Sequence, residues 1–195
     1  MLPEQLGYIA IVTTLTGAFF YIRDIFKGET RPHLISWFFW GIAPLIGAFL
    51  QLKAGVGLSV VPVLMAGICG LLGFVAGIIA HNGYWKISKL DIACGVFSLA
   101  SLFLWITTRN TDISIVFAIL TDGFAYIPTL IKSWKSPETE SASGYLPGIF
   151  NNILGLLIIK NWDFSIYSFP IYFVIINLIT VVFIYRKKII LWYTK

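Results

Sequence analysis

The sequence predicts an all-α membrane protein with seven transmembrane helices, and its composition and the arrangement of its apolar runs support this fold class. The chain has 195 residues, of which 58% are hydrophobic and 12% charged, with a mean hydropathy of +0.86. Soluble domains are about 45–50% apolar and about 25% charged, so a water-soluble core of this size could not cover so much apolar surface. The apolar runs are continuous and lack the two-residue alternation of barrel strands, which favours helices.

Seven apolar runs follow one another, and the connections between them are too short for a soluble domain. Residues 1–195 are therefore expected to form one integral membrane domain. The runs cover Leu6–Ile25, Leu34–Leu52, Leu58–Ala80, Ile92–Ile106, Ile113–Ile131, Tyr145–Ile159 and Ser165–Tyr185. A crossing needs about 20 helical residues, so the fourth and sixth runs must be completed by interfacial residues.

Two distant stretches of the chain are similar, which predicts an internal duplication. Tyr21–Leu45 (YIRDIFKGETRPHLISWFFWGIAPL) aligns with Tyr126–Asn152 (YIPTLIKSWKSPETESASGYLPGIFNN), and further along Cys69 falls opposite Asn177. Each copy contains three apolar runs.

The duplication also predicts how the halves are arranged. Repeat one covers about 6–80 and repeat two about 113–186, which leaves the run within 91–107 as a linker helix. Such a linker keeps the two three-helix repeats parallel (3+1+3), and a central cavity between the halves is the usual place for a substrate.

The distribution of Lys and Arg predicts the orientation in the membrane. On the side of the amino terminus lie Lys53, Arg109 and Lys160. On the opposite side lie Arg23, Lys27, Arg31, Lys86, Lys89, Lys132, Lys135, Arg186, Lys187, Lys188 and Lys195. We therefore expect a multi-pass protein of the cell membrane with the amino terminus outside and the carboxyl terminus cytoplasmic. Since the basic residues lie in loops and form no stripe, nucleic acid is not an expected partner, whereas the basic tail should contact anionic lipid.

One loop carries a motif known from other membrane proteins. Pro128-Thr129 and the following Lys132, Ser133, Ser136, Thr139 and Ser143 resemble the Pro-Gln motif and polar loop of the PQ-loop superfamily, which includes the SWEET sugar transporters. Thr129 stands where the family has Gln, and the first half has Arg23-Asp24 at the matching place. The segment GETRPHLISWFFW also resembles a run in small bacterial membrane proteins of this layout.

The resemblance implies a function and some of its residues. It implies transport of a small solute by alternating access between two three-helix bundles. Prolines that act as hinges in SWEET-like transporters match Pro44, Pro128 and Pro147 approximately. An asparagine that contacts substrate in that family matches Asn177, although its partner in the first repeat is Cys69.

Asp122 is the only acidic residue well inside an apolar run, and Tyr126 follows it by four positions. A carboxylate at membrane depth usually faces a cavity or a partner and marks a functional path. It is stable there when neutral or when a cavity solvates it, so protonation of Asp122 is a plausible route to proton coupling. The alternative is a shallow, solvated Asp122 near the outer surface.

Further candidates for ligand binding are amides and indoles. Asn151 and Asn177 suit a sugar, nucleoside or amino-acid-like ligand, but equally suit hydrogen bonds between helices. Trp37 and Trp40 share a helix face and could stack on a flat ligand. An interfacial belt position is the alternative for Trp37.

These observations predict a transporter of a small polar solute, with substrate-binding residues Trp37, Trp40, Asp122, Tyr126, Asn151 and Asn177. The alternative is a receptor or scaffold of the same fold that transports nothing. Catalytic motifs and paired carboxylates are absent from the sequence, and His33 and His81 are separated by an apolar run. We therefore expect no enzyme activity, cofactor or metal. The oligomeric state is left open.

Overall fold

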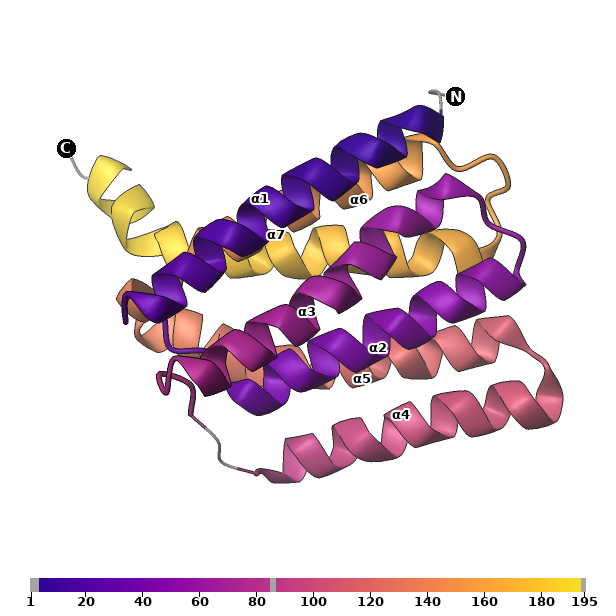
Figure 1. Cartoon of the computed structure of the whole chain (residues 1–195), viewed down its shortest axis with the longest axis horizontal. Helices are drawn as coiled ribbons and strands as arrows, with labels where there is room; N and C mark the ends of the chain where they lie inside the picture. Colours follow the sequence, from indigo (N-terminus) through magenta and orange to yellow (C-terminus); the bar gives the residue numbers. More distant parts are fainter. Residues whose placement is uncertain (1–3, 85–86, 194–195) are drawn as a thin grey trace.

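The computed structural model describes residues 4–84 and 87–193, and within them every regular element is a helix. The α-helices are α1 (Gly7–Phe26), α2 (Leu34–Lys53), α3 (Val61–Ile79), α4 (Lys89–Thr108), α5 (Thr111–Lys135), α6 (Leu146–Leu157) and α7 (Phe164–Tyr193). Short 3-10 helices are η1 (Glu4–Leu6), η2 (Leu58–Val60), η3 (Pro137–Thr139) and η4 (Ala142–Gly144). Successive α-helices run in opposite directions (Figure 1). The predicted all-α class is confirmed.

Six of the α-helices in the described chain are long and apolar enough to cross a membrane, and α6 is the exception. The short fourth run becomes a helix of 20 residues, because it gains a first turn capped by Ser88 and Asp91 and ends at Arg109, whose φ of 53° is left-handed. The sixth run does not lengthen. Ile158 and Ile159 follow the end of α6 and are buried in the connection to α7.

Prolines occupy two kinds of position. Pro44, Pro128 and Pro170 lie inside α2, α5 and α7, where each removes one intrahelical hydrogen bond. Pro62 and Pro147 lie in the first turns of α3 and α6, where the missing N–H costs nothing. Of the three predicted hinge residues, Pro147 therefore lies at the start of a helix, whereas Pro44 and Pro128 lie inside one.

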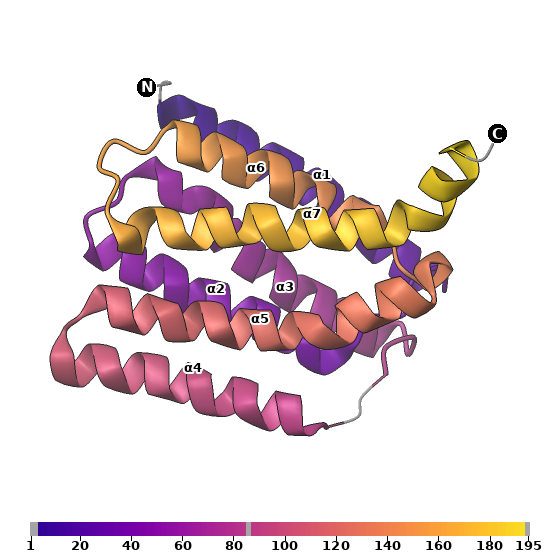
Figure 2. The same cartoon turned by 180° about the vertical axis from the view of Figure 1, so that it is seen from behind.

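The helices pack in a regular pattern (Figures 1 and 2). In the first half α3 packs against both α1 and α2, and in the second half α7 packs against both α5 and α6. Two seams join the halves, one between α2 and α5 and one between α1 and α6. Helix α4 packs mainly on α5 at the edge of the bundle.

Small residues allow the closest helix contacts. A Cβ atom built on Gly70 of α3 would lie 2.6 Å from the backbone oxygen of Trp40 in α2, so no larger residue fits there without moving a helix.

Apolar side chains of α4, among them Leu99 and Phe103, are exposed on the outside, whereas Asp122 and Asn151 are buried inside. Apolar residues outside and polar residues inside are the distribution expected of a helix bundle in lipid.

Candidate functional site

A cavity of about 90 Å³ lies inside the bundle, between helices of both halves. Its walls are formed by Thr14, Ala18, Tyr21, Ile22, Trp37, Trp40, Pro62, Ala66, Cys69, Gly70, Gly73, Tyr126, Gly144, Tyr145, Pro147, Gly148, Asn151, Asn152, Phe173 and Asn177. Five of the six predicted substrate-binding residues are among them, and Asp122 is not. The residues matched by the duplication also meet here, since Tyr21 and Tyr126 line the cavity, as do Cys69 and Asn177.

Aromatic rings form one continuous wall. Trp37 lies between Tyr21 and Trp40, with ring centroids 4.6 Å and 5.3 Å away. Trp40 in turn packs on Tyr126 at 4.2 Å and meets the edge of Tyr145 at 6.2 Å. Because Trp37 is only 8% exposed, it belongs to this interior wall and not to an interfacial belt. Ring faces of this kind stack on flat ligands.

The asparagines belong to hydrogen-bond networks inside the protein. Asn177 accepts a hydrogen bond from the Tyr126 hydroxyl at 3.2 Å and donates to the carbonyl of Phe173 at 2.7 Å. Asn151 donates to Thr14 Oγ1 at 2.6 Å and accepts from Thr13, so it joins α6 to α1 as well as lining the cavity. Both asparagines therefore form hydrogen bonds within the bundle and also line the cavity.

Two polar atoms on cavity residues have no hydrogen-bond partner in the protein. They are the indole nitrogen Nε1 of Trp40 and the amide oxygen Oδ1 of Asn152, and both are buried. Asn152 uses its Nδ2 to donate to the Gly148 carbonyl at 2.8 Å. Buried polar groups are nearly always paired, so these two atoms are candidates for ligand contacts.

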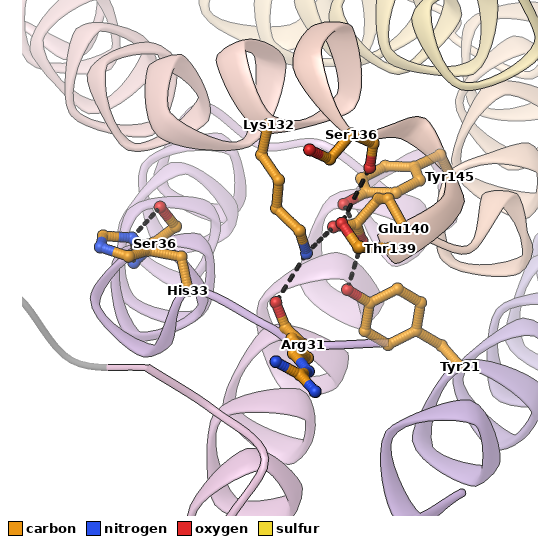
Figure 3. A network of polar contacts seen from close by, with 9 residues as sticks. All are labelled: Tyr21, Arg31, His33, Ser36, Lys132, Ser136, Thr139, Glu140 and Tyr145. Carbon is orange, nitrogen blue, oxygen red and sulfur yellow. Dashed lines mark hydrogen bonds and ion pairs between the residues drawn. The ribbon is translucent and has the colours of Figure 1, made fainter. Parts of the chain in front are cut away.

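A charged network lies next to the cavity (Figure 3). The buried carboxylate of Glu140, between η3 and η4, accepts hydrogen bonds from Tyr21 at 2.5 Å and Tyr145 at 3.0 Å. It also forms an ion pair with Lys132 of α5 at 2.7 Å, and Lys132 donates at 2.6 Å to the carbonyl of Arg31. The two tyrosine rings line the cavity while their hydroxyl groups bind Glu140. We call this side of the bundle the Glu140 end.

Sequence reasoning did not identify Glu140, Tyr21 or Tyr145 as functional residues. The alignment of Tyr21 with Tyr126 was an available signal, because both residues prove to line the cavity. For Glu140 no such signal exists, because it is one of several acidic residues in loops and its burial depends on the folded chain.

Asp122 lies in the middle of α5 and is fully buried, which excludes the shallow, solvated position. One carboxylate oxygen accepts a hydrogen bond from the Tyr172 hydroxyl of α7 at 2.8 Å, and the other has no partner. The contact joins two helices of the second half. Asp122 therefore links α5 to α7, while Tyr126, one turn later, lines the cavity.

At the carboxyl-terminal tail, the Arg186 guanidinium lies 4.2 Å from the centre of the Trp134 ring. The side chains of the adjacent Lys187 and Lys188 lie outside the described residues, so the expected lipid contact of this tail stays a prediction.

The described part of the chain contains no group of three or more His, Cys, Asp or Glu that could hold a metal ion. Comparisons with models of protein families, with curated proteins and with solved structures find no match for this chain.

Proposed function

We propose that this protein transports a small polar solute across the cell membrane by alternating access. The observation that carries the proposal is the interior cavity, which is lined from both halves of the chain and contains five predicted ligand-binding residues. A cavity at the junction of two similar halves is where secondary transporters bind their substrates.

The helix contacts support two parallel three-helix bundles joined by α4. The third helix of each half, α3 or α7, packs against the other two. If the halves are equivalent, α1 corresponds to α5 and α2 to α6. The contact between α1 and α6 then corresponds to the contact between α5 and α2, and both contacts exist. This internal symmetry agrees with the 3+1+3 arrangement that the resemblance to SWEET-like proteins implies.

Alternating access also requires a barrier at each end of the cavity that can open. At the Glu140 end the barrier is the network that connects Tyr21 of the first half to Lys132 and Tyr145 of the second. From the excess of Lys and Arg on this side, we infer that this end faces the cytoplasm. Opening toward the cytoplasm then requires the hydrogen bond between Tyr21 and Glu140 to break.

Flux measurements on purified protein in proteoliposomes test the proposal. The expected result is uptake of at least one labelled neutral solute, tested with glucose, uracil, uridine and alanine, above the level of empty liposomes. Saturable binding without flux would instead favour the receptor, and absence of both would favour the scaffold.

Cysteine labelling in intact cells tests the orientation. A cysteine at position 53 is expected to react with an impermeant reagent from outside, and a cysteine at position 135 only after permeabilisation. The opposite pattern would contradict the proposed topology.

A further inference from the structure

The cavity wall lacks charged side chains. Among the described residues that line it there is no Asp, Glu, Lys, Arg or His. The nearest charged network contains Glu140 and Lys132, which already neutralise each other. An ion buried in this cavity would have no countercharge, which costs several kcal/mol. The solute that fits the cavity is therefore uncharged.

Most buried polar side chains of the wall already have a hydrogen-bond partner within the protein. The hydroxyls of Tyr21, Tyr126 and Tyr145 donate to side-chain oxygens of Glu140 or Asn177, and the Asn151 amide binds threonines of α1. Among the buried side-chain nitrogen and oxygen atoms of the wall, one donor, Trp40 Nε1, and one acceptor, Asn152 Oδ1, have no partner at all. A solute with many hydroxyl groups would lose more hydrogen bonds to water than the wall can replace.

We propose that the solute is a neutral heteroaromatic ring of the nucleobase type, with a carbonyl oxygen that accepts from Trp40 and a ring N–H that donates to Asn152. The flat ring matches the aromatic wall of Trp37, Trp40 and Tyr126, and its two polar groups match the two free atoms. A pyranose with its hydroxyls and a zwitterionic amino acid match neither property.

This ligand class deepens the proposed function and rests on the same cavity. Trp40 belongs to α2 of the first half and Asn152 to α6 of the second. A ring that contacts both therefore links the two halves, and binding is expected to stabilise the arrangement in which they enclose the cavity.

Binding of radiolabelled uracil to the purified full-length protein in detergent, measured by equilibrium dialysis, tests the inference. Uracil is expected to bind, and unlabelled glucose or alanine at the same concentration is expected not to displace it. Trp40→Phe keeps a ring but removes the N–H, and Asn152→Leu removes the amide oxygen. Each is expected to weaken uracil binding about fivefold to tenfold, the value of one hydrogen bond.

Two controls make the test specific. Trp162→Phe changes an exposed tryptophan outside the cavity and is expected to leave the affinity unchanged. 1,3-Dimethyluracil keeps both carbonyl groups but has no N–H, so it should bind the natural protein about fivefold to tenfold more weakly than uracil. With Asn152→Leu the two compounds should bind equally, because the acceptor is gone.

The inference is overturned if uracil does not bind, if glucose or alanine displaces it, or if the preference for uracil over its dimethyl form persists in Asn152→Leu. The proposed transport fails separately: uracil that binds as described but does not cross proteoliposomes would support the ligand class and refute transport. Glucose flux without uracil binding would support transport and refute the ligand class.

Discussion

Breaking the ion pair at the Glu140 end should open the cavity. In the closed arrangement the Lys132 side chain is 13% exposed and that of Glu140 is 2% exposed. Lys132→Met removes the countercharge and leaves the Glu140 carboxylate buried with only the two tyrosine hydroxyls as partners. Opening this end would let water reach the carboxylate, so the substitution destabilises the closed arrangement more than the open one.

The size of the effect follows from the burial of the pair. Removing one partner of a buried ion pair costs about 3–5 kcal/mol. Each 1.36 kcal/mol changes an equilibrium tenfold, so the open population should rise about 100-fold to 5000-fold. Replacing both residues, in Lys132→Met with Glu140→Gln, leaves no buried charge. The double variant should therefore open less than Lys132→Met alone, which is the opposite of additive behaviour.

The chain contains a natural reporter of this opening. Cys69 lines the cavity, whereas Cys94 is fully buried and outside it. In a Cys94→Ala background, the rate at which a charged thiol reagent modifies Cys69 measures the open fraction, provided opening and closing are fast compared with labelling. Purified protein in nanodiscs exposes both ends to the reagent, and a variant that also lacks Cys69 gives the background.

Comparing Lys132→Met with the double variant also controls for misfolding, because both lack the Lys132 side chain. Both variants should elute as a single species by size exclusion. If Lys132→Met labels at the natural rate, or if the double variant labels faster than Lys132→Met, the network is not the barrier.

Three further predictions concern other parts of the bundle. Asp122→Asn should abolish any change of flux between about pH 5 and 8, because the amide imitates the protonated carboxyl; an unchanged pH profile in the variant would refute proton coupling. Asn151→Leu removes hydrogen bonds between α6 and α1 and should cost about 1–2 kcal/mol, seen as a lower melting temperature in detergent; an unchanged value would contradict this. Gly70→Ala should cost about 1–3 kcal/mol through its clash with α2, whereas Gly95→Ala, whose nearest neighbouring atom is 3.9 Å away, should melt no lower than the natural protein. Equal melting of these two glycine variants would contradict the close approach.

The helices and much of the cavity could be predicted from the sequence because both depend on local pattern. Each apolar run largely coincides with an α-helix, since lipid leaves the backbone no other partner. Trp37 and Trp40 share a helix face by their spacing. Cys69 and Asn177, which the predicted duplication pairs, both line the cavity.

Other features depend on how each helix is rotated and where it ends. Asp122 and Tyr126 are one turn apart on α5, yet the carboxylate contacts α7 and the tyrosine reaches the cavity, a division that spacing does not reveal. Ile158 and Ile159 extend an apolar run, but they are buried in a non-helical connection, so the run predicted a longer helix than exists. The pairing of Lys132 with Glu140 requires the polar loop to fold back against α1, which only the tertiary structure determines.

The shortness of α6 couples the protein to the thickness of its bilayer. Its 12 residues rise about 18 Å, against a hydrocarbon core of about 30 Å, and Phe150, Ile153 and Leu157 face outward along it. The bilayer beside α6 is therefore expected to become thinner, at a cost of fractions of a kcal/mol per Å of mismatch. Because α6 packs against α1 of the other half, a movement of the halves would change how much of the short helix α6 is exposed to lipid. Membranes with shorter or longer acyl chains should thus favour different conformations of the same protein.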